Sequence, residues 1–415
     1  MTDFKSLNLS SKILQSLEKK GYKTPTPIQK DAIPHLLEGK DLLGIAQTGT
    51  GKTAAFSLPI LNNLSKTNNK VKANHVRALI LTPTRELASQ IADNIDRYGD
   101  CLDLNHIVVF GGVAVNPQIR NLKKGVDILI ATPGRLLDLM NQGQINYAQL
   151  EILVLDEADR MLDMGFINDV KKIISKLPKK RQNLLFSATM PSTIFSLANS
   201  ILNNPIKVEV TPAATTVEKI DQKVTFVPKA QKISLLIELL NKDEAKTVLV
   251  FSKTKHGANK IVKHLLDNDI ESAAIHGNKK QGAREKALDN FRTGKNKVLV
   301  ATDIAARGID VPNITHVVNF DIPHDPESYV HRIGRTARAG KTGVAVSFCD
   351  PSEVKLLRSV EKVIKYKIPA ENQPEFKEKP AVNQNNNRNN NRARNNTQNK
   401  KTNPSDQEQV KKKRF

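Results

Sequence analysis

The chain has 415 residues, of which 39% are hydrophobic and 4% are aromatic, and it contains no tryptophan. Lys and Arg total 64 against 42 for Asp and Glu, so the formal net charge is +22. At roughly 100–200 residues per domain, this length predicts about two or three domains. The charge favours a polyanionic partner such as nucleic acid, although a generally basic protein would share it. The scarcity of aromatic side chains argues against binding single strands mainly by base stacking.

Cysteine usage and the N-terminal sequence indicate the compartment. Cys101 and Cys349 lie far apart in the sequence and form no CxxC pair, so neither a zinc site nor a disulfide framework is expected. Residues 1–7 contain no signal-peptide core, and no apolar run is long enough to span a bilayer. We therefore expect a soluble, cytoplasmic protein with no membrane partner.

Short apolar runs alternate with helix-like stretches along most of the chain. The runs are continuous rather than alternating, as expected for parallel strands covered on both faces. Strands are expected at 42–45, 78–81, 128–130, 152–155 and 183–186, and then at 247–251, 273–275, 298–300, 316–318 and 344–346. The pattern predicts an α/β fold with two parallel sheets in tandem.

The predicted boundaries follow composition. Residues 1–30 precede the first sheet, 31–209 form the first domain, 210–223 form a polar, Pro-containing linker, and 224–371 form the second domain. From 372 to 415 the chain is rich in Asn, Lys and Arg and ends in a basic run. Because that segment has too little apolar surface to offset ordering entropy, we expect a disordered basic tail. It would either tether RNA or only increase solubility.

A glycine-rich loop follows the first predicted strand and precedes a helical stretch. It reads Ala46-Gln47-Thr48-Gly49-Thr50-Gly51-Lys52-Thr53, with Ala where the usual pattern opens on Gly. Glycines let successive N–H groups turn toward phosphate oxygens, and the helix N-terminus adds partial positive charge. Lys52 would reach the terminal phosphates and Thr53 would hold magnesium. The segment from Gln47 to Thr53 is therefore the predicted phosphate site.

Two acidic residues follow the apolar run 152–155 directly, within Asp156-Glu157-Ala158-Asp159. This places them at the carboxyl end of a buried strand, where ligands bind in open α/β sheets. Asp156 would coordinate magnesium, and Glu157 would orient and activate water. A helix-capping loop would explain the charges but not their position.

Together these motifs resemble those of the DEAD-box family of ATP-dependent RNA helicases. The acidic segment spells the family name, and Ser187-Ala188-Thr189 follows the next strand, as in the family. The resemblance covers roughly 4–369 and implies two RecA-like domains. It implies that Ser187 and Thr189 bond to the acidic loop and, with Asp159, link hydrolysis to RNA binding. Residues 252–259 and 275–279 look like the bacterial RhlE-type branch.

An adenine-reading motif is expected upstream of the phosphate site. Residues 21–29 look like the family's Q motif, in which Gln29 offers both a donor and an acceptor to the adenine edge. Tyr22 would stack on the ring, and Phe4 stands where the family carries an isolated upstream aromatic. A GTPase would instead need an Asn-Lys-x-Asp segment, and the nearest one, 241–244, has its Asp one place early.

Three further segments resemble the family's RNA-backbone contacts. Thr132 suits a helix N-cap and Pro133 the first helical position, so free N–H groups would face an anion. Ordinary capping would explain each segment alone. The resemblance implies RNA contacts by Pro83, Thr84, Arg85, Gly111, Gly112, Thr132, Pro133, Gly134 and Arg135. Contacts of this kind ignore base identity.

The second half carries residues 301–310 and 331–338, which match two more family motifs. The arginines could form only a basic surface, or they could clamp phosphate as arginine fingers do. By resemblance, Arg335 and Arg338 contact the ATP γ-phosphate, Asp310 contacts ribose, and Thr302 contacts RNA.

The resemblance implies an RNA helicase that hydrolyses ATP with Mg²⁺ and locally unwinds short duplexes between two RecA-like domains. Two other readings stay open, namely an ATP-gated RNA clamp that promotes annealing and a DNA helicase. Ribosomal particles and the RNA-decay machinery are expected partners, and the process is ribosome assembly, RNA turnover or cold adaptation.

Overall fold

The structure is a computed structural model of the chain. It describes residues 3–47, 49–67, 70–210, 220–306, 311, 313–337 and 342–372. We call the described residues from 3 to 210 the first lobe and those from 220 to 372 the second lobe. The expected basic tail lies outside the described residues, except for Asn372.

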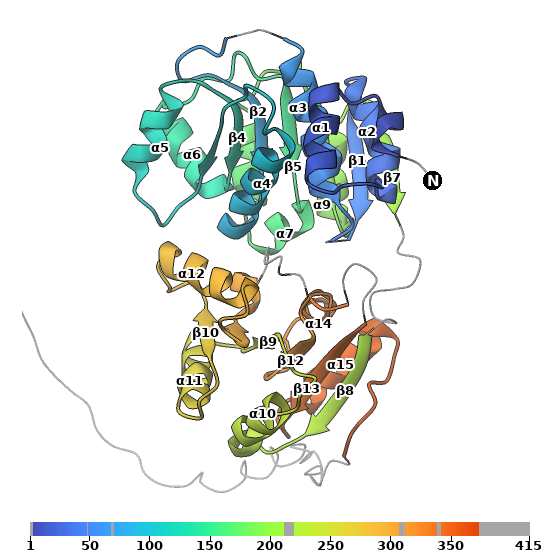
Figure 1. The fold of residues 1–415 in the computed structure, drawn as a ribbon, viewed down its shortest axis with the longest axis vertical. Coiled ribbons are helices and arrows are strands. Elements are labelled where there is room, and N and C mark those ends of the chain that lie inside the picture. The colour runs from blue at the N-terminus through green and yellow to red at the C-terminus, as the bar shows by residue number, and fades with distance from the viewer. Residues whose placement is uncertain are drawn as a thin grey trace, which may run out of the picture. The chain divides into compact units, whose positions relative to one another are not determined.

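The first lobe is built on a seven-stranded, all-parallel sheet (Figure 1). Its strand order is β3-β4-β2-β5-β6-β1-β7. The strands are β1 (Leu42–Ala46), β2 (Val76–Leu81), β3 (His106–Val109), β4 (Val126–Ala131), β5 (Ile152–Leu155), β6 (Gln182–Ser187) and β7 (Ile206–Val210).

Helices cover both faces of this sheet. They are a short 3₁₀ helix (Phe4–Leu7), α1 (Ser11–Lys19), α2 (Pro27–Leu37), α3 (Lys52–Ser65), α4 (Arg85–Tyr98), α5 (Val115–Leu122), α6 (Pro133–Asn141), α7 (Ala158–Asp163), α8 (Ile167–Ile174) and α9 (Ser192–Ile201). Successive residues of β2 show the two faces, because Ile80 packs in one core cluster and Leu79 in the other. The continuous apolar runs of the sequence follow from this double coverage.

The second lobe has a six-stranded parallel sheet in the order β10-β11-β9-β12-β13-β8. The strands are β8 (Ile220–Phe226), β9 (Val248–Phe251), β10 (Ser272–Ile275), β11 (Val298–Ala301), β12 (His316–Asn319) and β13 (Gly343–Cys349). The helices are a 3₁₀ turn (Lys229–Gln231), α10 (Lys232–Leu240), α11 (Lys255–Leu266), α12 (Gln281–Arg292), α13 (Asp303–Ala306), α14 (Pro326–Ile333) and α15 (Val354–Ile364). The expectation of two parallel α/β units is confirmed.

Every apolar run expected as a strand corresponds to one, whereas β3, β7 and β8 were not expected. All three lie at sheet edges. Along β7, Lys207 and Glu209 are exposed while Val208 is buried, so the strand has no continuous apolar run. Strand β8 begins at Ile220, and residues 220–223 of the expected linker therefore belong to the second sheet. Residues 211–219 lie outside the described part.

The end of the second lobe is fixed along the outer edge of β8. The Val224 N–H donates to the Pro369 carbonyl at 2.9 Å, and the Glu371 N–H donates to the Val224 carbonyl at 3.0 Å. Asn372 continues the pairing with its side chain, since its amide both donates to and accepts from the Phe226 backbone at 2.8 Å. Asn372 was expected to open the disordered tail, but these bonds make it part of the folded lobe.

None of the helices described is long and apolar enough to cross a membrane.

Candidate active site and nucleic-acid interface

The predicted motifs of the first lobe lie along the carboxyl edge of its sheet, which is the side where the strands end. Each follows the carboxyl end of a strand, and parallel strands present these ends on the same side. Across the sheet, from β3 to β1, the segments are Gly111-Gly112 after β3, Thr132–Arg135 after β4, Pro83–Arg85 after β2, Asp156–Asp159 after β5, Ser187–Thr189 after β6 and the glycine-rich loop after β1. The expected RNA contacts therefore occupy one half of the edge and the phosphate loop the other.

The glycine-rich loop turns from β1 into α3 through left-handed backbone at Gly49 and Gly51, with φ of 87° and 95°. Thr50 closes the turn by donating its hydroxyl to the Gln47 carbonyl at 2.8 Å. Lys52 is buried and its Nζ donates to the Ala46 carbonyl at 2.8 Å. The loop thus places one ammonium at the N-terminus of α3, and such a helix N-terminus is the arrangement that receives phosphates. Thr48 lies outside the described residues.

Two buried carboxylates lie beside this loop. Asp156 and Glu157 are 2% and 3% exposed. Burial raises the pKa of Asp156 to about 7, an effect that Lys52 partly opposes and Glu157 reinforces. Glu157 caps α7 with a left-handed φ of 53°, a conformation that is strained for a non-glycine residue and that often marks functional sites. Its Oε2 accepts from Arg160 at 3.1 Å.

The buried carboxylate of Asp156 suits a divalent cation, because burial disfavours its charge until a cation compensates it. The described residues hold no cluster of three His, Cys, Asp or Glu side chains that could cage a metal alone. Magnesium in nucleotide sites needs no such cage, since one or two carboxylates together with substrate phosphates and water complete its coordination. Asp156 and Thr53 are the residues that would hold it.

Asp159 joins the acidic segment to the segment after β6. Its Oδ2 accepts from the Thr189 hydroxyl at 3.0 Å and from the backbone N–H groups of Ala188 and Thr189 at 3.1 and 2.8 Å. In return, the Asp159 N–H donates to the Ser187 hydroxyl at 3.2 Å. These bonds match the contact that the family resemblance implied.

The Q-motif glutamine contacts the phosphate loop directly. Gln29 Nε2 donates to the Gly51 carbonyl at 3.1 Å, while its Oε1 accepts from the Thr26 N–H at 3.0 Å. Gly51 has a φ of 95°, and a Cβ there would lie 2.4 Å from Gln29 Nε2, so a larger residue would be strained at this position. An amide has two N–H groups and two acceptor lone pairs, so one of each stays available for a base.

The two aromatic residues expected at the nucleotide lie differently. Tyr22 is 38% exposed, with its ring edge-on to Tyr98 at 5.6 Å. Phe4 is only 4% exposed and belongs to the core of the first lobe. The resemblance placed Phe4 at the position of the family's isolated upstream aromatic, and in this structure its 3₁₀ helix turns the ring into that core.

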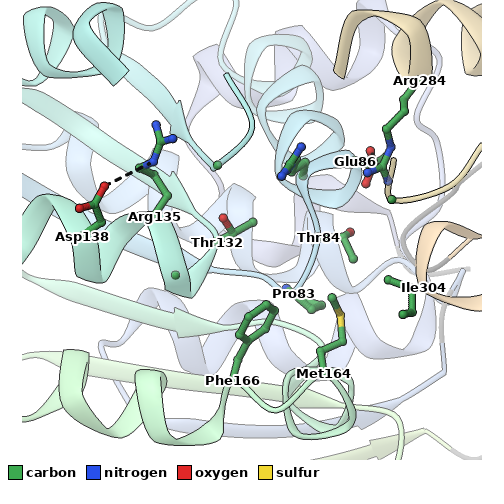
Figure 2. Close-up of a pocket in the computed structure, with 14 residues that line it drawn as sticks. Pro83, Thr84, Glu86, Thr132, Arg135, Asp138, Met164, Phe166, Arg284 and Ile304 are labelled. Carbon is green, nitrogen blue, oxygen red and sulfur yellow. Dashed lines mark ion pairs between the residues drawn. The ribbon is translucent and has the colours of Figure 1, made fainter. Parts of the chain in front are cut away.

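The other half of the edge lines an open pocket of about 490 Å³, whose charged residues are Arg85, Arg135, Arg284, Glu86 and Asp138 (Figure 2). Pro83, Thr84, Arg85, Gly111, Thr132, Gly134 and Arg135 line it. Burial and the neighbouring cations Arg284 and Arg135 lower the pKa of Arg85. Arg135 Nη2 donates to the Val113 carbonyl at 3.3 Å, whereas its buried Nη1 has no partner among the described residues. Crowded cations with unused donors indicate an anionic ligand.

Gly112 makes room for Arg85. It has a φ of 80°, and a Cβ there would lie 2.1 Å from Arg85 Nη1. At Gly111, in contrast, a Cβ would meet only Arg85 Nη2 at 3.8 Å. The resemblance implied RNA contacts at this glycine pair, and the structure shows that Gly112 also makes room for the arginine.

The second lobe contributes a buried arginine cluster. Arg335 is 3% exposed and follows α14, and Thr302 follows β11. Asp310 and Arg338, both predicted site residues, lie outside the described part. Arg332 makes a two-pronged ion pair with Asp303, at 2.5 and 2.7 Å, and donates to Asn319 at 3.2 Å. It therefore ties three segments of this lobe together.

Sequence reasoning assigned no role to three residues that the structure links to these motifs. Arg160 pairs with Glu157, Glu86 follows Arg85 in the RNA segment, and Arg284 Nη2 lies 2.8 Å from Glu86 Oε1. Figure 2 shows Arg284 reaching toward Glu86. Nothing in the sequence marks Arg284 beyond one more positive charge, because the pairing joins residues far apart in the chain.

A mononucleotide phosphate site and a polyanion-binding edge on one parallel sheet, followed by a second similar sheet, define an NTP-dependent nucleic-acid enzyme. Two family models match the chain, DEAD/DEAH box helicase over residues 26–197 and helicase conserved C-terminal domain over residues 231–340. The chain belongs to the family of DEAD-box ATP-dependent RNA helicases.

Related proteins cover most of the chain. It is 42% identical to the DEAD-box ATP-dependent RNA helicase CshA of Geobacillus kaustophilus, over 91% of this chain and 80% of that one. It is also 42% identical to RhpA of Helicobacter pylori, over 92% and 75%. None of the relatives named here is an RhlE protein, so the expected RhlE-type branch is not supported.

Solved structures share the fold. S. cerevisiae Dbp5 bound to RNA and ADP BeF3 matches with a TM-score of 0.78 and 32% identity, over 89% of this chain and 95% of that one. Mss116p bound to ssRNA and AMP-PNP matches with a TM-score of 0.79 and 30% identity, over 90% and 80%. Each of the two sheets, together with the helices that cover it, therefore forms a RecA-like domain.

Proposed function

We propose that this chain binds ATP at the loop from Gln47 to Thr53, grips the RNA backbone at the β3-β4-β2 half of the same sheet edge, and locally unwinds short duplexes. The observation that carries the proposal is the order of the segments along that edge. The acidic segment after β5 lies between the RNA half and the phosphate half. A shift of Asp156–Asp159 on ATP binding or hydrolysis would therefore affect both the RNA contacts and the phosphate loop.

The proposed roles follow the chemistry of each group. Lys52 neutralises phosphate charge, and Glu157 orients and activates the attacking water. Asp156 and Thr53 hold magnesium, which would supply charge neutralisation at the phosphates. Arg335, together with Arg338, contacts the γ-phosphate, and Asp310 contacts the ribose. Gln29 and Tyr22 recognise adenine.

The RNA roles rest on groups that bind backbone rather than bases. Arg85 and Arg135 supply charge, and the α4 and α6 N-termini supply N–H groups that face an anion. Contacts of this type carry little sequence information. Together with Thr302, they would bind structured RNA of many sequences. The ATP-bound and RNA-bound states would stabilise each other, because the two ligands share the acidic segment.

The biological setting is also a proposal. A cytoplasmic role in ribosome assembly or RNA turnover fits a sequence-tolerant RNA helicase, and ribosomal particles or decay enzymes would be its partners. Crosslinking in cells, followed by sequencing of the bound RNA, tests this. Reads enriched in ribosomal RNA precursors would support ribosome assembly, and reads spread over messenger RNA would support RNA turnover. Reads in neither class of RNA would exclude both processes.

The decisive test of the activity is strand displacement on matched RNA and DNA duplexes. Wild-type protein with ATP should displace the RNA duplex much faster than the DNA duplex. Lys52→Ala should nearly abolish ATP hydrolysis and displacement, because developing phosphate charge loses its direct partner. Hydrolysis by Lys52→Ala within a few-fold of wild type would overturn the site, and equal displacement of both duplexes would favour a DNA helicase.

A second candidate function is an ATP-gated RNA clamp that promotes annealing. The basic composition of residues 373–415 favours it, because a positively charged segment brings two RNA strands together. Annealing should then proceed with ATP bound but without turnover. Annealing that is lost on removal of residues 373–415 while displacement persists would assign the two activities to different parts of the chain.

A further inference from the structure

A groove on the flank of the first lobe lies away from the carboxyl edge of the sheet. We call it the α6–α8 groove, since it lies between the second half of α6, the loop after it, and α8 with the residues that follow. Its volume is about 690 Å³. Leu137, Met140 and Ile145 provide apolar surface, and Lys172 and Lys176 line it as well. None of these residues belongs to the nucleotide site or the RNA contacts.

The apolar residues of the groove are only half-buried. Leu137, Met140 and Ile145 pack with one side against the core cluster that contains Leu79 and leave the other side open to the groove. Because apolar area left in water costs free energy in proportion to its extent, a partner that covers these side chains gains stabilisation. The thioether of Met140 also adapts its shape to different partners.

The groove contains a buried hydroxyl that lacks a partner. Tyr147 is 8% exposed, and its Oη has no hydrogen-bond partner among the described residues. Burial raises the pKa of Tyr147, so the phenol stays protonated and keeps a proton to donate. A buried polar group without a partner is costly. Tyr147 lines the groove, so an occupant with a carbonyl or carboxylate oxygen would satisfy it.

The charged residues that line the groove have one sign. Lys172 and Lys176 are exposed, and the chain segment that carries them also contains Lys171, Lys179, Lys180 and Arg181. None of the residues lining the groove is acidic. The nearest acid on α6, Asp138, faces Arg135 at 3.7 Å. The groove therefore combines an apolar floor with a basic rim.

We propose that the α6–α8 groove binds an acidic, amphipathic helical segment of a partner protein. Apolar side chains at helical spacing would cover Leu137, Met140 and Ile145, as in other helix-in-groove complexes. Carboxylates on the flanks would face Lys172 and Lys176. An apolar centre with a polar rim is the usual anatomy of such interfaces.

Other occupants fit this surface less well. The chain's own residues 373–415 are rich in Lys and Arg, so the basic rim would repel them. RNA would use the lysines, but a polyanion gains nothing from the floor formed by Leu137, Met140 and Ile145. Exposed aromatic rings, which would stack bases, do not line the groove.

The test uses the full chain and a fluorescein-labelled peptide of Leu and Glu, with Leu at i, i+3, i+4 and i+7 positions. Fluorescence anisotropy measures affinity, and hydrogen–deuterium exchange locates the bound peptide. A scrambled peptide of equal composition and a peptide with Lys in place of Glu serve as controls. Only the amphipathic acidic peptide should bind tightly, and it should slow exchange in α6 and α8.

Matched variants separate this site from general charge effects. Lys172→Glu with Lys176→Glu should weaken peptide binding by about tenfold or more. Lys260→Glu with Lys263→Glu on α11 makes the same charge change on exposed residues elsewhere and should not weaken it. Met140→Gln should also weaken binding, and its thermal unfolding checks that the lobe still folds.

Three results would overturn the proposal. The first is that the scrambled peptide binds as tightly as the amphipathic acidic peptide. The second is that Lys260→Glu with Lys263→Glu weakens peptide binding as much as Lys172→Glu with Lys176→Glu does. The third is that Lys172→Glu with Lys176→Glu leaves peptide binding unchanged but raises the RNA concentration for half-maximal ATPase stimulation. That result would make the groove an RNA surface. Because none of the substituted residues touches the nucleotide site or the RNA contacts, failure here leaves the helicase proposal untouched.

Discussion

The Asp159 carboxylate accepts a hydrogen bond from the Thr189 hydroxyl at 3.0 Å, and this contact joins the segments that follow β5 and β6. The same carboxylate oxygen also accepts from two backbone N–H groups. A buried carboxylate with several donors fixes its neighbours firmly, since hydrogen bonds to charged groups are the stronger ones. We propose that these bonds pass changes at the acidic segment to Ser187–Thr189.

Thr189→Val tests this connection because it keeps the shape and removes the hydroxyl donor. Strand displacement should fall by roughly tenfold, as expected for a lost bond to a charged group. RNA-stimulated ATP hydrolysis should fall much less, because Lys52 and Glu157 are unchanged. Parallel displacement and phosphate-release assays provide the comparison. Equal losses in both would mean that Thr189 serves catalysis rather than coupling.

Glu157→Gln should trap the protein with ATP and RNA bound. The amide keeps the size of the side chain but is a poor base, so turnover should fall by about 10²–10⁴-fold. RNA binding in the presence of ATP should persist, and RNA dissociation should be slower than in wild type. Single-turnover hydrolysis and RNA release, followed on the same sample, measure both. Release as fast as wild type contradicts the role given to Glu157.

Gly112→Ala should displace Arg85 from its present position. The new Cβ would lie 2.1 Å from Nη1, and the flexible side chain moves more easily than the backbone. The RNA concentration for half-maximal ATPase stimulation should rise by roughly tenfold, as for a lost charged contact, with little change in RNA-saturated kcat. Gly111→Ala is the matched control, because its Cβ meets only Nη2 at 3.8 Å. Equal effects of the two variants would contradict the role given to Arg85.

Truncation after Asn372 should leave RNA-saturated kcat nearly unchanged and raise the RNA concentration for half-maximal stimulation. The removed residues are basic, so the difference should shrink as salt rises and counterion release weakens phosphate contacts. ATPase titrations of full-length and truncated protein across a salt series decide the matter. Coincident curves at all salt concentrations would leave residues 373–415 with a solubility role only.

Truncation after Pro369 is the matched comparison. It also removes the Glu371 and Asn372 bonds to β8, so the second lobe should unfold at lower denaturant. The loss should be about 1–3 kcal/mol, since edge groups of β8 lose their partners. Denaturant melts that coincide for the two truncations would show that this pairing contributes nothing.

A pair of tyrosine variants tests the unpartnered hydroxyl of the α6–α8 groove. Tyr147→Phe removes a hydroxyl without a partner among the described residues, so stability should stay within about 0.5 kcal/mol or rise. Tyr329→Phe breaks a buried bond to Gln222 Oε1 of 3.0 Å and should cost about 1 kcal/mol. Denaturant unfolding of both variants measures the difference. An equal loss in both would show that Tyr147 has a partner.

The apolar runs of the sequence sufficed to locate the central strands, because a strand covered on both faces carries a continuous apolar signature. Edge strands such as β7 and β8 lack it, since solvent or a single neighbour covers part of them. For the same reason the expected linker extended to residue 223, although β8 begins at Ile220. Strand β8 pairs with β13 through backbone groups, and this pairing does not depend on which side chains the strand carries.

The sequence by itself determined the chemistry of the site. The phosphate loop, the acidic segment and the RNA segments were recognisable because each consists of neighbouring residues after a strand. Only the tertiary structure decided the contacts between them. It brought Gln29 into contact with Gly51 and buried Phe4 in the core. It also packed Arg85 against Gly112 and bonded Asn372 to β8. Such contacts join residues distant in the chain, so local sequence cannot specify them.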